Sequence, residues 1–121
     1  MARSHLPANT WLSPNNPLIA NTNLSDGVCN AFWDGSTTNF YRGSKARGCR
    51  NTGEISAIVA HEFGHGLDEN DLVKTISKPS GEGIADVYAA LRFNDSCVGR
   101  GYYTRQKCTI GTGSCFECTG E

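Results

Sequence analysis

Six cysteines are the feature that most limits what this chain of 121 residues can fold into. An even number of cysteines in a small, loop-rich chain indicates a disulfide framework, and with it an oxidising, extracellular location for a secreted protein. They are Cys29, Cys49, Cys97, Cys108, Cys115 and Cys118. We expect Cys29 to pair with Cys49 and the last four to pair among themselves. The alternative is a metal knuckle at the C-x-x-C of residues 115–118, with two upstream cysteines as further ligands.

The composition predicts one small domain and favours neither nucleic acid nor membrane as a partner. Apolar residues make up 38% of the chain and glycines number 14, so a modest core surrounded by loops is expected. Eleven basic and twelve acidic residues leave a net charge of -1, which does not favour nucleic-acid binding. No apolar run is long enough to cross a bilayer, and no polybasic run favours a membrane surface. We expect a monomer that binds neither nucleic acid nor membrane.

Three parts of the chain differ in composition. Residues 1–27 are rich in Pro, Asn and Ser and predict an extended N-terminal arm, with one short strand at 17–20. Residues 28–93 carry the regular elements of a predicted core. Residues 94–121 are rich in Cys and Gly and predict an irregular tail. The start lacks an apolar signal segment and the end stops among cysteines, so we expect a piece of a longer protein.

Two β-prone runs and two helical patterns make up the core. Residues 28–33 and 38–42 flank Asp34-Gly35, a strong hairpin signal. Asn51 and Glu54 resemble a capping box and open a helix that we expect to end at Gly66. A second helix is predicted at 81–93, with Ser80 as its cap. Its apolar stripe consists of Ala85, Tyr88, Ala89 and Leu91. The predicted fold class is α+β, with a small sheet or hairpin and its edge strand packed over the two helices.

The first helix contains HEFGH, which places His61 and His65 four residues apart. Residues at this spacing lie on one helix face, so both imidazoles can point at one metal ion. Zinc accepts histidine nitrogen and usually takes four ligands, so the pair supplies half of a site. Glu62 projects beside the pair and suits a general base acting on a zinc-bound water. The alternative is a partly exposed helix with ordinary histidines.

An acidic pair on the second helix offers the missing ligand. Glu82 and Asp86 are also four residues apart and share a helix face. If the helices fold against each other, Glu82 can be the third ligand. Asp86 can then accept a hydrogen bond from the far ring nitrogen of His61, which fixes the tautomer. The alternative for both carboxylates is a solvated helix face.

Asp71 is a rival third ligand. It follows His65 by six residues, the spacing found in metzincin peptidases. That pattern also needs a glycine where Asp68 stands, because the chain must turn sharply there. Asp68, Glu69 and Asp71 also fit a hydrophilic loop or a weak calcium site, and nothing else in the sequence supports calcium.

Three motifs in order resemble those of the thermolysin-like zinc metallopeptidases, the gluzincins. HEFGH at 61–65, followed by GEGIAD at 81–86, resembles the HExxH and (N/G)ExxxD pair of that family. NAFW at 30–33 resembles its segment that forms the edge strand of the substrate cleft. The resemblance extends over about residues 28–91, and three ordered motifs are far more specific than any one of them.

The resemblance implies a metalloendopeptidase that hydrolyses a peptide or protein substrate through a zinc-bound water activated by Glu62. The implied ligands of the single zinc ion are His61, His65 and Glu82. The resemblance also implies that Asp86 orients His61. Asn30 and Ala31 are implied to hold the substrate backbone by strand addition.

The chain departs from this family at the groups that stabilise the oxyanion. The family uses a tyrosine and a histidine, but no Tyr or His lies between His65 and Glu82 and no histidine follows His65. Losing one such donor costs a factor of about 10²–10³ in rate. Candidate substitutes are Tyr88, Tyr102, Tyr103, Arg92 and Arg100. The alternative function is therefore a zinc-stabilised, disulfide-tied binding or structural module with a degenerate peptidase site.

Overall fold

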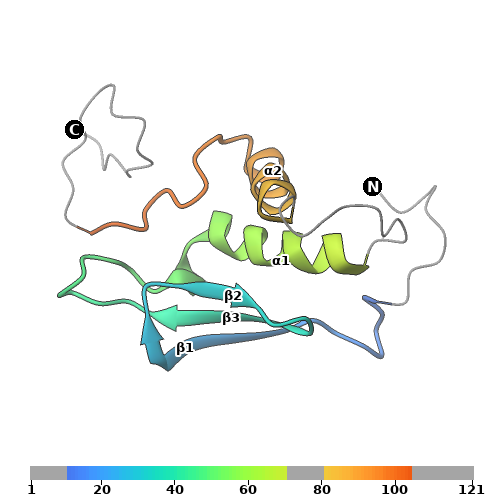
Figure 1. Cartoon of the computed structure of the whole chain (residues 1–121), viewed down its shortest axis with the longest axis horizontal. Helices are drawn as coiled ribbons and strands as arrows, with labels where there is room; N and C mark the ends of the chain where they lie inside the picture. Colours follow the sequence, from blue (N-terminus) through green and yellow to red (C-terminus); the bar gives the residue numbers. More distant parts are fainter. Residues whose placement is uncertain (1–10, 71–80, 105–121) are drawn as a thin grey trace.

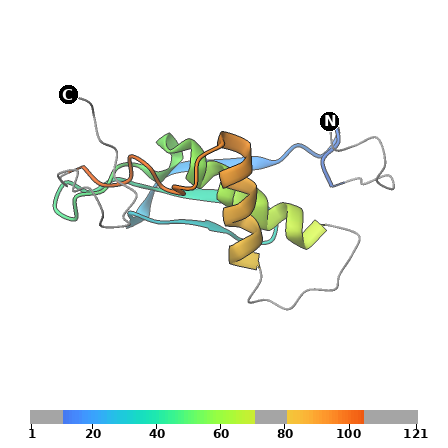
Figure 2. The ribbon, with the colours of Figure 1, turned by 90° about the horizontal axis from the view of Figure 1, so that it is seen from above.

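The computed structural model describes residues 11–70 and 81–104. The elements are β1 (Ile19–Val28), β2 (Ala31–Trp33), β3 (Thr37–Arg42), η1 (Thr52–Glu54), α1 (Ser56–Asn70) and α2 (Gly81–Phe93). The sheet has the order β1-β3-β2, with β3 parallel to β1 and antiparallel to β2. Figure 1 shows α1 lying on one face of the sheet and α2 lying beyond α1. Seen from above, α2 crosses α1 steeply (Figure 2). The α+β class, with a small sheet and two helices, is confirmed.

Asp34 builds the turn between β2 and β3. Its carboxylate accepts hydrogen bonds from the backbone N–H groups of Ser36 at 2.8 Å and Thr37 at 2.7 Å. It also accepts one from the Thr37 hydroxyl at 2.7 Å. Gly35 has φ of +95°, a left-handed conformation that favours glycine. The two strands pair in antiparallel register on either side of this turn, so the predicted hairpin is confirmed.

We expect Asp34→Asn to lower the thermal unfolding midpoint near neutral pH. Hydrogen bonds, led by the one from the Thr37 N–H, lower the pKa of Asp34 from 3.8 to about 2. A lowered pKa contributes stability that is present above the unfolded value and is lost as the pH falls through the folded value. The gap between parent and Asp34→Asn should therefore close as the pH falls through about 2. Thermal melts followed by circular dichroism, from neutral pH down through about 2, measure the difference in unfolding midpoint between the two proteins. A difference that does not change with pH would contradict the role of the Asp34 charge.

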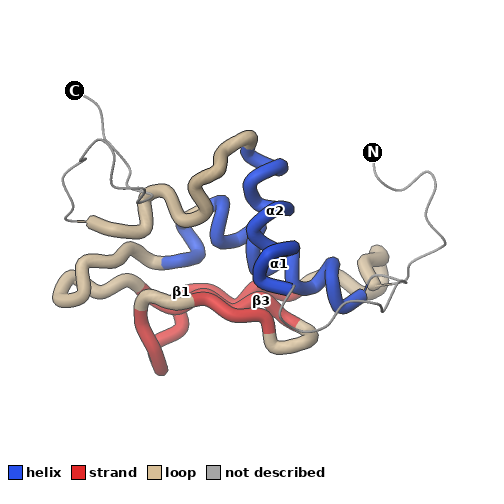
Figure 3. The backbone as a smooth tube through the Cα atoms, turned by 45° about the horizontal axis from the view of Figure 1, so that its top comes forward, coloured by secondary structure: helices blue, strands red, loops and turns tan. Residues whose placement is uncertain are grey.

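β1 is longer than the short strand expected at 17–20. Its side chains are mostly exposed, so no apolar alternation marks it in the sequence. It is held by pairing with β3, and the Asn21 amide donates to the side-chain oxygen of the buried Asn39 at 2.9 Å. Figure 3 shows the strands as one layer beneath the helices. The division of the chain into arm, core and tail stays a prediction.

Both expected ends of α1 were wrong. The Asn51 side chain accepts a hydrogen bond from the Gly53 N–H at 3.0 Å and caps the short η1, and α1 begins only after it. Gly66 does not end α1, which continues to Asn70. A Cβ at Gly66 would lie 2.6 Å from the ring of Trp11. This glycine therefore admits an aromatic ring against the helix backbone instead of turning the chain.

α2 occupies the predicted range 81–93, and its proposed cap Ser80 lies outside the described residues. Ala85 and Ala89 are 0% and 1% exposed, as expected for the stripe that packs on α1. Including Leu91 in that stripe was wrong, because its side chain is 79% exposed. Leu91 lies about 200° around the helix from Ala89 and so points away from α1. Neither described helix is long and apolar enough to cross a membrane.

The disulfide between Cys29 and Cys49 is present, as predicted. It links the start of the hairpin to the loop after β3 and closes a loop with a sequence separation of 20. In the chain-entropy account, such a loop contributes about 3 kcal/mol of stability. Cys97 is also disulfide-bonded, and no cysteine of the described part is a free thiol. The other three cysteines lie outside the described residues, and the disulfide bond of Cys97 removes one upstream ligand from the alternative metal knuckle.

Candidate metal centre

Two histidines of α1 and one glutamate of α2 bring their polar atoms together. The Nε2 atoms of His61 and His65 lie 3.1 Å apart. One carboxylate oxygen of Glu82 lies 3.1 Å from Nε2 of His61, and the other lies 3.4 Å from Nε2 of His65. The histidine side chains are 16% and 19% exposed, whereas that of Glu82 is 74% exposed. The cluster is therefore recessed on the α1 side and open to solvent on the α2 side.

These separations fit a zinc ion. In a tetrahedral site with ligands at about 2.0–2.1 Å, neighbouring ligand atoms are about 3.3 Å apart. One atom from each of the three side chains lies within 4.8 Å of the others, and the described residues contain no second group of this kind. Imidazole nitrogen and carboxylate oxygen are both zinc ligands, and three protein ligands with an open side are typical of catalytic sites. The rival ligand Asp71 lies outside the described residues.

Asp86 contacts the back of one of these imidazoles. Its Oδ1 lies 2.7 Å from Nδ1 of His61. The carboxylate accepts a hydrogen bond there, so Nδ1 carries the proton and Nε2 turns its lone pair toward the cluster. Glu82 and Asp86 are one helical turn apart, and they reach the two ring nitrogens of the same histidine. Such a contact raises the basicity of an imidazole that binds a metal.

Gly64 allows the close approach of the two helices. A Cβ added at this position would lie 2.7 Å from the Cα of Ala85 and 3.2 Å from its Cβ. Because both residues are small, α2 packs directly on the backbone of α1 between the two histidines. That packing brings Glu82 within reach of them. The sequence shows the small residue, but it does not show which residue packs against it.

Glu62 is buried on the side of α1 that faces β2, with 5% of its surface exposed. Burial is the largest cause that raises its pKa from 4.5 to about 7. Electrostatic interaction with His61 lowers the pKa of Glu62, interaction with Glu82 raises it, and a hydrogen bond from the backbone N–H of Trp33 lowers it. A carboxyl group with a pKa near neutrality can both accept a proton and return it.

β2 is an edge strand, because within the described sheet it pairs with β3 alone. Ala31 is its first residue. The carbonyl of Asn30, just before it, accepts hydrogen bonds from the Tyr41 N–H at 2.9 Å and the Thr52 hydroxyl at 2.8 Å. This carbonyl is thus used by the fold. The substrate-binding roles of Asn30 and Ala31 stay predictions.

Three of the candidate oxyanion donors lie in the segment after α2 and have other contacts. The Tyr102 hydroxyl donates to the Cys29 carbonyl at 2.6 Å. The guanidinium of Arg100 pairs with Asp95, with the closest contact at 2.6 Å. Tyr103 packs its ring edge-on against Tyr102, with 4.7 Å between the ring centroids. These contacts direct Arg100 and Tyr103 to neighbours within this segment, and the Tyr102 hydroxyl to the backbone just before β2.

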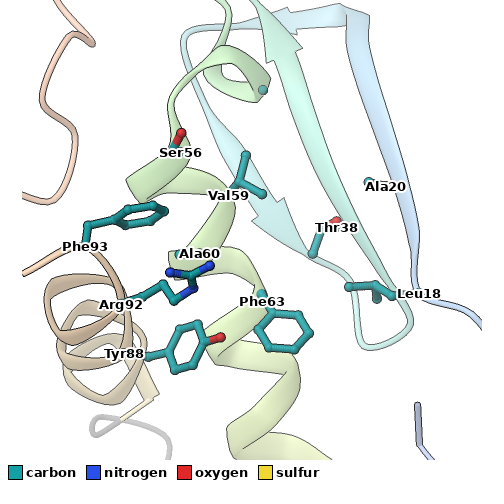
Figure 4. Close-up of a pocket in the computed structure, with 11 residues that line it drawn as sticks. Leu18, Ala20, Thr38, Ser56, Val59, Ala60, Phe63, Tyr88, Arg92 and Phe93 are labelled. Atoms are coloured by element: carbon teal, nitrogen blue, oxygen red, sulfur yellow. The ribbon is translucent and has the colours of Figure 1, made fainter. Parts of the chain in front are cut away.

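Tyr88 and Arg92 belong to a separate hollow. It has a volume of about 420 Å³ and lies between α1, α2 and the sheet. Figure 4 shows Tyr88 next to Phe63 of α1, and Arg92 and Val59 line the same hollow. Residues 59 and 63 lie about half a turn around α1 from residue 61, so this hollow is on the side of the helix away from the histidines.

One contact beside the centre was not foreseen. The indole Nε1 of Trp33 donates to Oε2 of Glu69 at 2.8 Å. A loop was expected at Glu69 because Gly66 was expected to end the helix. With α1 continuing to Asn70, Glu62, Gly66 and Glu69 lie on one stripe of the helix.

A family model described as "Thermolysin metallopeptidase, catalytic domain" matches residues 9–69, about half of the chain. This range contains His61, Glu62 and His65. It ends before Glu82 and Asp86, so their assignment rests on the packing of α2 against α1. A comparison with curated proteins gave no match.

Proposed function

Because the chain belongs to the thermolysin metallopeptidase family, we propose that it is a zinc-dependent endopeptidase acting on peptide or protein substrates. The observation that carries this proposal is the convergence of His61, His65 and Glu82. These three side chains would hold the ion. Zinc held there would polarise the scissile carbonyl and make water a stronger acid.

Glu62 acts first as the base and then as the acid. Its carboxylate takes a proton from the attacking water and passes it to the nitrogen of the leaving amine, which regenerates the carboxylate. Its burial beside β2 and its pKa of about 7 support both roles. Asp86 keeps the Nε2 of His61 available as a ligand by holding the proton on Nδ1.

The substrate binds as an extended strand along the open edge of β2. Main-chain hydrogen bonds at Ala31 give affinity without regard to sequence. The Asn30 side chain supplies a further contact, since its carbonyl is used within the fold. The disulfide at Cys29, directly before this edge, supports action in an oxidising, extracellular compartment.

Removing the metal is expected to abolish cleavage of an unfolded protein substrate, because the side chains alone do not polarise the carbonyl. About one equivalent of Zn²⁺ should restore cleavage, whereas Mg²⁺ should not, since it prefers oxygen ligands in octahedral geometry. The release of a fluorescent product after chelation and metal return measures both. Cleavage that persists after complete chelation would contradict the proposal.

A second candidate function is a zinc-stabilised structural or binding module. It is favoured by the contacts of Tyr102 and Arg100, which direct these proposed oxyanion donors into other interactions. In that case zinc would raise the stability of the fold while no peptide is cleaved. The buried Glu62 counts against it, because a structural site needs no buried carboxyl group beside its ligands.

A further inference from the structure

Trp33, the last residue of β2, contacts α1 at three positions on one stripe. Its backbone N–H lies close enough to the Glu62 carboxyl to lower the pKa of that group, its ring lies over Gly66, and its indole N–H reaches Glu69. The first and last of these positions are seven steps apart along the helix, or about 10 Å along its axis. One residue of the edge strand therefore lies along two turns of the helix that carries the proposed base.

The ring lies directly against the helix backbone. A Cβ at Gly66 would be 3.3 Å from the Trp33 ring, so nothing larger than hydrogen separates the two. Trp11 packs edge-on against the Trp33 ring from another side, with 6.0 Å between the ring centroids. The ring is thereby held on two sides, and the hydrogen bond from its Nε1 to Glu69 at 2.8 Å fixes its rotation.

The backbone of Trp33 lies beside the proposed base, Glu62. Trp33 pairs with Thr38 of β3, and its backbone N–H is near enough to Glu62 on α1 to lower the pKa of that carboxyl. A shift of the Trp33 side chain on the helix would move this N–H relative to the Glu62 carboxylate. Misplacement of a catalytic group by about 1 Å can cost a factor of about 10² in rate.

We propose that Glu69 is a positioning residue that acts through Trp33. By anchoring the indole N–H, it fixes the end of β2 against α1 and holds the carboxylate of Glu62 in its working orientation. The kinetic part of this inference rests on the proposed peptidase function. The structural part, that Glu69 controls the contact between Trp33 and Glu62, does not.

Amide exchange of the zinc-loaded protein tests the structural part. The chain has two tryptophans, so Trp11→Phe identifies the Trp33 indole resonance. Glu69→Ala should speed solvent exchange of both the indole and the backbone N–H of Trp33. Glu69→Gln keeps an oxygen acceptor and should restore most of the protection. Glu54→Ala, which removes an exposed glutamate from η1, is the matched control and should change neither N–H.

Steady-state kinetics of the same variants test the kinetic part. Glu69→Ala should lower kcat by about tenfold with KM and zinc content little changed, and Glu69→Gln should recover most of that loss. Trp33→Phe should lower kcat similarly, and adding Glu69→Ala to it should cause no further loss, because the two changes remove one interaction.

Two outcomes would overturn the inference. The first is faster exchange of the Trp33 indole N–H alone, with the exchange of its backbone N–H and kcat unchanged. Glu69 would then fix the indole ring without affecting Glu62. The second is additive losses in Trp33→Phe and Glu69→Ala. If the parent protein cleaves no peptide, the proposed function fails, whereas the exchange rates still decide whether Glu69 controls the contact between Trp33 and Glu62.

Discussion

Glu62→Gln is expected to reduce peptide cleavage by a factor of about 10²–10⁴, the usual contribution of a general base. Glutamine keeps the size and the polar tip of the side chain, but it cannot take a proton from water or deliver one to the leaving amine. Zinc should remain bound, because the ligand atoms of His61, His65 and Glu82 are unchanged. Initial rates on a fluorogenic peptide, together with zinc content, measure the effect.

The matched control for this change is Glu54→Gln, which makes the same substitution at an exposed position on η1. It should leave both cleavage and zinc content at the level of the parent. Glu62→Gln with the activity of the parent would remove Glu62 from the proposed mechanism. A parent that binds zinc but cleaves nothing, with stability that depends on zinc, would instead support the structural module.

Gly64→Ala is expected to lower zinc affinity by about tenfold or more. The added Cβ would lie 2.7 Å from the Cα of Ala85. This is a contact with backbone that side-chain rotation cannot relieve, so α2 must move away from α1. Glu82 then moves away from the two histidines, and displacing one of three protein ligands weakens the site. Overpacking of this kind also costs about 1–3 kcal/mol of stability.

Gly83→Ala provides the opposite case on the neighbouring helix. A Cβ at Gly83 would meet no atom of the described structure within 4 Å, and alanine in a helix is favoured over glycine by about 1 kcal/mol. This variant should be as stable as the parent or more so, with unchanged zinc affinity. Competition titrations with a zinc indicator and urea unfolding of the zinc-free proteins measure both variants. Parent-like zinc affinity in Gly64→Ala would show that the helix contact does not control the site.

The parts of the fold that depend on local chemistry could be predicted. Asp34 and Gly35 predict their turn because the interactions that form it are local. The Asp34 carboxylate bonds to backbone N–H groups two and three residues ahead, and Gly35 takes up the positive φ. The candidate site was predictable because the i, i+4 spacing of each pair fixes which side chains share a helix face. The step that sequence could not supply is the contact between the helices, which depends on Gly64 meeting Ala85.

The wrong expectations have one physical origin, which is that distant packing overrides a local signal. Glycine is a common residue at helix ends, but Gly66 lies inside α1. Its role is to admit the rings of Trp11 and Trp33, residues far from it in the sequence. β1 lacks a strand pattern because its hydrogen bonds to β3 stabilise a polar, exposed segment. The hydrogen bond from Trp33 to Glu69 joins residues 36 apart, which no period in the sequence marks.

We propose that His61, His65 and Glu82 hold a single zinc ion, and the zinc content per chain measures whether they do. Elemental analysis of the parent should find about one zinc per chain, and Glu82→Ala should retain little or none after dialysis. Full retention of zinc in Glu82→Ala, or a parent that takes up no zinc when it is offered, would contradict the claim.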